Sequence, residues 1–88
     1  MTHEETLTIQ NETGLHARPA ALLVKGAGQF QSQIQLVKGD KQADAKSLLG
    51  VMSLSVRKGD ELVIRAEGDD AADAARSLRQ LIENGLGE

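Results

Sequence analysis

The first two elements of the fold are set by residues 6–28, which read TLTIQNETGLHARPAALLVKGAG. Residues 5–10, which overlap the start of this stretch, alternate between polar and apolar side chains, which is typical of a strand with one buried face. Residues 11–14 break the alternation. From residue 17 to about residue 29 the apolar side chains recur at helical spacing, which indicates an amphipathic helix. The stretch therefore predicts a strand, a turn and a helix in that order.

The middle of the chain predicts a hairpin and a short helix. Residues 33–37 alternate, and a Gly-Asp pair then forms a two-residue turn that leads to a short strand near residues 41–44. Ser47 precedes the apolar residues 48–52. Because serine is a favoured N-cap, we expect a short helix to begin there.

The last third of the chain predicts one strand and one helix. Residues 61–67 alternate, Asp69 or Asp70 can cap the helix that follows, and Gly85 can end it. The order of elements is then β-α-β-β-α-β-α, and each strand has one apolar face. Such a set predicts an α+β fold in which a four-stranded antiparallel sheet is covered on one face by three helices. Residues 1–4 are expected to be frayed.

The length and composition predict one soluble domain over residues 1–88. Of the residues, 40% are hydrophobic and 26% are charged, which is typical of a globular chain. There is no cysteine, which excludes disulfide scaffolds, thiolate metal sites and cysteine nucleophiles. The longest aliphatic run, residues 20–24, is too short for a membrane span or a signal peptide. We therefore expect a cytoplasmic protein with no membrane partner.

The charge pattern argues against a nucleic-acid partner. The formal net charge is −3 and Phe30 is the only aromatic residue, so neither a phosphate-backbone interface nor a base-stacking platform is expected. The negative charge is uneven, because no carboxylate occurs between Glu12 and Asp40. That interval holds three basic residues, Arg18, Lys25 and Lys38. This basic segment indicates an anionic ligand or an acidic partner.

The residues with the clearest chemistry lie where the first predicted helix begins. Pro19 belongs in a first helical turn, which puts His16 at or next to the N-cap. A helix start offers free backbone N–H groups and the positive end of the dipole, which together bind anions. We expect a neutral imidazole there, whose nucleophilic nitrogen can carry a phosphoryl group held by the N–H groups and Arg18. A capping or surface role for His16 is the plain alternative.

The second candidate site is the short predicted helix. Ser47 is expected to act as its N-cap. On pattern alone the apolar side chains favour burial in the core, although a helix this short and apolar can leave some of them exposed. The side chains in question are Leu48, Leu49 and Met52. His3 is the only other histidine, and nothing around it suggests a function.

Two segments of the chain resemble one known family. Residues 14–20, GLHARPA, resemble the active-site signature of HPr, the histidine-containing phosphocarrier family of the phosphoenolpyruvate-dependent sugar phosphotransferase system (PTS). Residues 45–54, AKSLLGVMSL, resemble the regulatory-serine segment of that family. The separation of the two segments, the chain length and the closing residues 85–88 also fit. The resemblance implies the family fold, an open-faced β-sandwich.

The resemblance also implies a phosphocarrier that is not a classical enzyme and needs no cofactor or metal. His16 would accept a phosphoryl group at Nδ1 from phosphorylated enzyme I and donate it to the IIA unit of a sugar permease. Arg18 would assist, and the backbone N–H groups of Ala17 and Arg18 would bind the phosphate. Ser47 would be phosphorylated by HPr kinase/phosphorylase and act on a transcriptional regulator. A monomer is expected, with a docking surface that includes Leu48, Leu49 and Met52.

Three other interpretations stay open at this point. A regulatory module without carrier turnover would depend on phosphorylated Ser47, although the family's regulatory paralogue lacks the histidine that stands here as His16. In the nitrogen-related branch of the PTS, the same chemistry would end in regulation rather than transport. A generic small ligand-binding or RNA-binding domain is the third, and the low aromatic content and net acidity weigh against the RNA version.

Overall fold

The chain folds in the predicted order of elements, βαββαβα. The computed structural model describes residues 1–86, and Gly87 and Glu88, which end the closing segment 85–88, lie outside the described residues. Residues 1–86 form four strands, which are β1 (Thr2–Thr8), β2 (Gln33–Lys38), β3 (Lys41–Asp44) and β4 (Glu61–Glu67). The same residues form three helices, which are α1 (Ala17–Ala27), α2 (Leu48–Ser53) and α3 (Ala71–Glu83).

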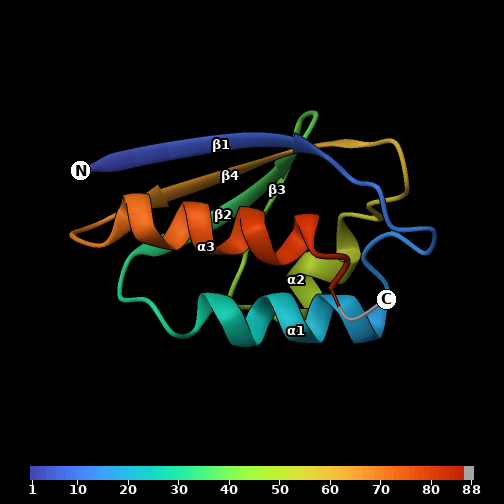
Figure 1. Cartoon of the computed structure of the whole chain (residues 1–88), viewed down its shortest axis with the longest axis horizontal. Coiled ribbons are helices and arrows are strands. Elements are labelled where there is room, and N and C mark those ends of the chain that lie inside the picture. The colour runs from blue at the N-terminus through green and yellow to red at the C-terminus, as the bar shows by residue number, and fades with distance from the viewer. Residues whose placement is uncertain (87–88) are drawn as a thin grey trace.

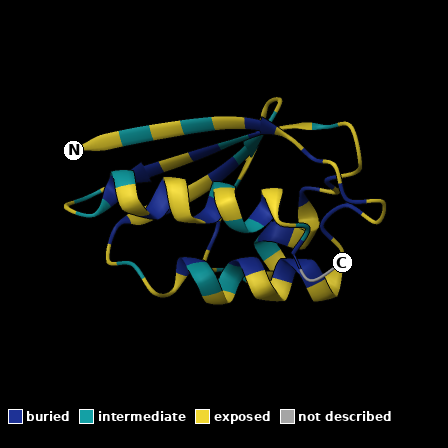
Figure 2. Ribbon diagram, viewed as in Figure 1, coloured by how far each residue is buried: buried dark blue, intermediate teal, exposed yellow. Residues whose placement is uncertain are grey.

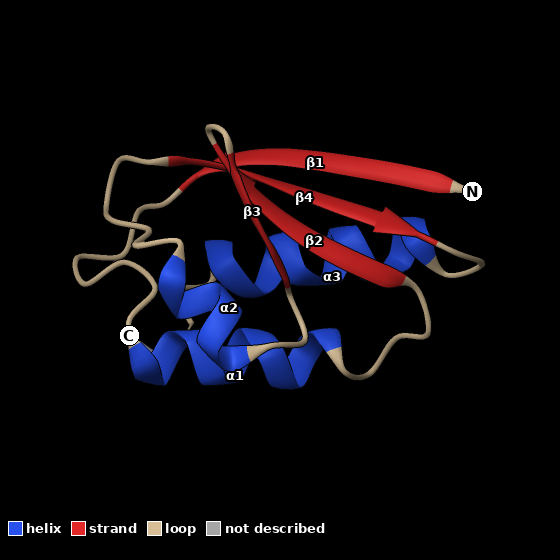
Figure 3. Cartoon of the chain, turned by 180° about the vertical axis from the view of Figure 1, so that it is seen from behind, coloured by secondary structure: helices blue, strands red, loops and turns tan. Residues whose placement is uncertain are grey.

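The strands form one antiparallel sheet in the order β1-β4-β2-β3. The last strand of the chain, β4, therefore lies between β1 and β2. Its register sets Leu62 opposite Leu7 and Ile64 opposite Leu36, so that buried side chains of three neighbouring strands meet. All three helices lie on one side of the sheet and leave its other face open (Figures 1 and 3). This arrangement confirms the predicted α+β open-faced sandwich.

Burial follows the two periodicities of the sequence (Figure 2). In β4 every second side chain is buried against the helices, as the strand pattern predicts. In α3 the buried stripe contains several alanines, whose small side chains let the helix pack closely on β1 and β4. The buried residues of α3 are Ala71, Ala74, Ala75, Leu78 and Ile82. The core therefore lies between the sheet and the helix layer.

The prediction of a frayed start at residues 1–4 is wrong. The strand β1 begins at Thr2, which pairs with Glu67 of β4. The alternation was hidden because two inward positions of this strand, His3 and Glu5, carry polar side chains. A polar residue at an inward position gives no apolar signal, so the strand looked shorter in the sequence than it is.

Glu5 can occupy an inward position because two side chains satisfy its carboxylate. Its Oε2 lies 2.5 Å from His3 Nε2, and its Oε1 accepts a hydrogen bond from Arg79 Nη1 at 2.7 Å. The bond from Arg79 first, and the bond from His3 second, hold the pKa of Glu5 below its ordinary value. His3 thus has a structural contact at the sheet edge, where the sequence suggested none.

Asp70 anchors the loop after α1 to the start of α3. It occupies the N-cap position of α3, but its side chain does not cap that helix. Its carboxylate instead accepts hydrogen bonds from Gln31 N and Ser32 N, both at 2.9 Å, and from the Ser32 hydroxyl. The Ser32 hydroxyl, followed by the Gln31 N–H, lowers the pKa of Asp70 from its ordinary value.

Candidate functional site

His16 stands at the N-cap of α1. Its φ of −81° and ψ of −170° are extended, and its carbonyl accepts the first helical hydrogen bond, from Ala20 N at 2.9 Å. The side chain does not cap the helix, so the capping role considered from the sequence is wrong. His16 is exposed, as are Ala17 and Arg18, the first two helical residues. An exposed imidazole therefore lies beside the positive end of a helix dipole.

The backbone N–H groups of Ala17 and Arg18 belong to this helix start. They precede the first intrahelical bond, and the next residue, the buried Pro19, has no N–H group. The first turn of α1 contains no acidic side chain. Within residues 1–86 the Arg18 guanidinium forms no ion pair, so its charge adds to that of the helix dipole. The position can therefore bind an anion through two amides and one planar cation.

The loop before His16 is fixed by backbone contacts that reach across the fold. The Asn11 side chain donates from Nδ2 to the Gly14 carbonyl at 2.6 Å, and Leu15 N donates to the Val56 carbonyl at 3.0 Å. Gly14 has a φ of +61°, and a Cβ added there would lie only 2.2 Å from the Val56 oxygen. Glycine is thus required where the loop touches residue 56.

Sequence reasoning missed both of these supports. Asn11 carried a usable signal, because asparagine side chains commonly bond to the backbone of the turn that they begin. Val56 carried none, because its contact joins segments far apart in the chain. The loop that carries His16 is therefore tied both to its own turn and to residue 56.

Ser47 caps α2 as predicted. Its φ of −111° and ψ of 114° are extended, and its Oγ accepts a hydrogen bond from Gly50 N at 3.1 Å. The residue is partly exposed. The Ser47 hydroxyl therefore forms a capping hydrogen bond, and the residue is in part accessible to solvent.

The short helix α2 presents an apolar patch, formed by Leu48, Leu49 and Met52, whose exposed fractions are 40%, 81% and 38%. Val51 of the same helix is fully buried. The core interpretation of Leu48, Leu49 and Met52 is thus wrong, because the helix buries Val51 and leaves these three side chains exposed. The helix α2 contacts α1 and lies over its N-terminal half (Figures 1 and 3). The apolar patch is therefore on the same helix layer as His16.

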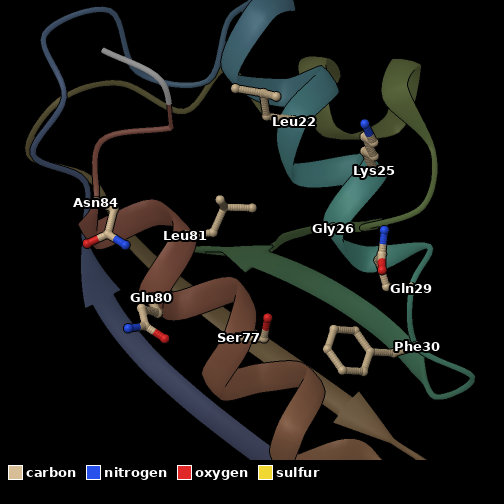
Figure 4. Close-up of a pocket in the computed structure, with 9 residues that line it drawn as sticks. All are labelled: Leu22, Lys25, Gly26, Gln29, Phe30, Ser77, Gln80, Leu81 and Asn84. Carbon is tan, nitrogen blue, oxygen red and sulfur yellow. The ribbon is translucent and has the colours of Figure 1, made fainter.

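A groove between α1 and α3 lies apart from His16 and Ser47. It encloses about 470 Å³, with Lys25 and Phe30 on one side and Gln80 and Leu81 on the other (Figure 4). Neither His16 nor Ser47 lines it. Among the described residues, no three His, Cys, Asp or Glu side chains cluster as a metal site. The candidate site at His16 is thus an exposed helix start outside this groove.

The comparisons with known proteins agree with this geometry. A family model described as the PTS HPr component phosphorylation site matches residues 3–84. The solved HPr from Thermoanaerobacter tengcongensis is 50% identical, with a TM-score of 0.93 over 98% of this chain and 97% of that one. HPr from Bacillus anthracis is 36% identical, with a TM-score of 0.88 over 92% and 96%. The Bacillus subtilis catabolite repression protein Crh, solved as an intertwined dimer with a swapped domain, is 40% identical, with a TM-score of 0.77 over 89% and 90%.

Fold and similarity together define a class, the small phosphocarrier proteins of the PTS. Proteins of this class hand a phosphoryl group between partners and are not classical enzymes. The chain belongs to the HPr family, as its two motifs suggested. Membership implies PTS partners such as enzyme I and IIA units. In the part of the chain that the structure describes, no helix has the length and apolarity to cross a bilayer.

Proposed function

We propose that this chain carries a phosphoryl group on His16, taken from phosphorylated enzyme I and passed to IIA units of sugar permeases. The observation that supports this most strongly is the exposed imidazole at the N-cap of α1, beside the amides of Ala17 and Arg18. The proposal further assigns a monomer as the working form. Sugar specificity then resides in the permease and not in this chain.

The transfer needs positioning and charge stabilisation rather than covalent machinery. The Nδ1 lone pair of His16 attacks the phosphorus of the donor's phosphoryl group. A new N–P bond forms as the bond to the donor atom breaks, and the electron pair leaves with the donor. The Ala17 and Arg18 N–H groups, with the Arg18 guanidinium, then bind the phosphoryl oxygens. Donation to IIA is the same displacement, in which the N–P bond of His16 breaks.

Ser47 is proposed as the regulatory phosphorylation site, acted on by HPr kinase/phosphorylase. A phosphate on Ser47 would lie at the start of α2, where negative charge is compatible with the fold, and would add about −1.5 to −2 units of charge. That charge would lie next to the apolar patch of Leu48, Leu49 and Met52, which we propose as the docking surface. It would weaken an acidic partner's docking and strengthen that of a basic one, such as a transcriptional regulator.

Intact-mass spectrometry tests the carrier role. After incubation with phosphoenolpyruvate and enzyme I, we expect a phosphate adduct at neutral pH that is lost in acid, because a phosphoramidate bond is labile. The adduct should be absent from His16→Ala and present in His3→Ala, since His3 is the matched control, a histidine held on the sheet by Glu5. No adduct on the unmodified chain, or an adduct on His16→Ala, would contradict the proposal.

A regulatory function is the second candidate, supported by the 40% identity to Crh. In that case a regulator would bind the chain according to its phosphorylation state, and no phosphoryl group would pass to a permease. A nitrogen-branch carrier would behave similarly. Sugar uptake by cells that carry His16→Ala separates these functions. Lost uptake supports the sugar carrier, and normal uptake supports regulation.

A further inference from the structure

We propose that Arg57 is a second cationic ligand of the phosphoryl group on His16, acting together with Arg18. This inference rests on the proposed carrier function and adds a residue to its site. Arg57 lies outside both sequence motifs, in the loop between α2 and β4. Only the folded chain brings it near the helix start.

The backbone of Arg57 lies against the His16 loop. A Cβ added to Gly14 would be 2.8 Å from Arg57 Cα, and Gly14 precedes His16 by two residues. The next contact, from Leu15 N to Val56 O at 3.0 Å, joins the same two segments. Arg57 is therefore a direct neighbour of the loop that carries the imidazole.

The position of Arg57 is fixed by its own turn. Its backbone N–H donates to Asp60 Oδ2 at 2.8 Å, and its carbonyl accepts from Asp60 N at 3.0 Å. Asp60 also pairs with Lys38 Nζ at 3.1 Å. These bonds involve only the Arg57 backbone, so the exposed side chain stays available for a ligand.

The charges around the loop leave the Arg57 guanidinium without an ion pair among the described residues. Its neighbour Lys58 is paired with Glu12 of the His16 loop at 2.6 Å. The carboxylate of Asp60 pairs with Lys38, and the Arg57 N–H first and Lys38 second hold the pKa of Asp60 below its ordinary value, with a smaller contribution from the Arg57 charge. Within residues 1–86 the Arg57 guanidinium makes neither a hydrogen bond nor an ion pair. Once His16 is phosphorylated, a dianion appears next to this cation, and a guanidinium binds phosphate oxygens through paired N–H donors.

Two cations that approach from different segments have a defined effect on the phosphoryl group. Arg18 comes from the first turn of α1, and Arg57 comes from the loop beside Gly14. Together they favour the dianionic form over the monoanionic form, because the attraction of each cation to the phosphoryl group weakens when the group takes up a proton. This change in the protonation of the phosphoryl group is a property of the isolated phosphorylated chain and does not require a bound partner.

Phosphorus NMR of the isolated phosphorylated chain tests the contact. We expect Arg57→Gln to move the midpoint of the phosphoryl chemical-shift titration up by about 0.5 pH unit, which is a threefold change in proton binding. Arg57→Lys should restore part of the shift. Lys58→Gln is the matched control, because this neighbouring cation already has Glu12 as its partner. For phosphoryl acceptance at low salt, kcat/KM of Arg57→Gln should fall about threefold.

The outcomes separate this inference from the carrier function. If the unmodified chain takes no phosphoryl group, the carrier function fails. If the original chain is phosphorylated normally and the phosphoryl group of Arg57→Gln titrates with the same midpoint as that of the original chain, only the Arg57 contact is overturned. A slower transfer with an unchanged titration also overturns it, because Arg57 would then act on partner docking. An equal shift in Lys58→Gln would show a general charge effect and overturn it as well.

Discussion

Replacing Gly14 by alanine tests the contact that fixes the His16 loop. Gly14 has a φ of +61°, where a residue with a Cβ costs about 1–2 kcal/mol. That Cβ would also lie 2.2 Å from the Val56 oxygen, so the backbone must move, and overpacking of this kind adds about 1–3 kcal/mol. We therefore expect Gly14→Ala to lower the free energy of unfolding by about 2–5 kcal/mol.

Gly39 provides the matched control. Its φ is +59°, but no atom lies within 4 Å of an added Cβ. Gly39→Ala should therefore lose only about 1–2 kcal/mol, for the backbone conformation alone. Urea denaturation followed by circular dichroism gives both free energies. Gly14→Ala should also slow phosphoryl acceptance, because the loop that holds His16 shifts, while Gly39→Ala should not. Equal losses of stability in the two variants would refute the close contact with residue 56.

Three further perturbations test other parts of the molecule. Ser47→Ala should lower the free energy of unfolding by about 0.5–2 kcal/mol through loss of the α2 cap, whereas Ser47→Asn should keep most of it; equal losses in urea denaturation would contradict the capping role. The pKa of Asp70 is lowered, mainly by the Ser32 hydroxyl. The ionised Asp70 carboxylate therefore stabilises the fold fully above the ordinary carboxyl pKa of about 4. This stabilisation is lost as the pH falls through the lower pKa of the folded state. Asp70→Asn should therefore weaken the acid dependence of the unfolding free energy, which denaturation at several pH values measures, and Asp69→Asn should leave it unchanged; the same acid dependence in both variants would disprove the assignment. Leu49→Gln should change the free energy of unfolding by less than about 0.5 kcal/mol, because the side chain is exposed, and still reduce kcat/KM for phosphoryl transfer from enzyme I; an unaltered kcat/KM would remove Leu49 from the docking surface.

The elements of the fold were predictable because their signals are local. Alternation over residues 61–67 identified the central strand, and helical spacing after Pro19 identified α1. The position of His16 followed from Pro19 as well, since proline fits the first helical turn. These features need only a few neighbouring residues, so one sequence contains enough information to find them.

The features that sequence reasoning missed depend on contacts between distant segments. The start of β1 was hidden because Glu5 points inward, and the fold tolerates Glu5 there through its contact with His3 and the bond from Arg79 of the distant helix α3. The contact of Gly14 with Val56 has no local signature either. For α2, an apolar run could not indicate that Val51 is buried while Leu49 is exposed, because that depends on where α1 and the sheet lie.

The central claim is that the start of α1 holds a phosphoryl group on His16. Amide NMR spectra of the chain before and after phosphorylation by enzyme I test it most directly. We expect the largest downfield shifts at the N–H groups of Ala17 and Arg18, because these amides gain hydrogen bonds to phosphoryl oxygens. Spectra in which these two amides stay unchanged while His16 is phosphorylated would contradict the account.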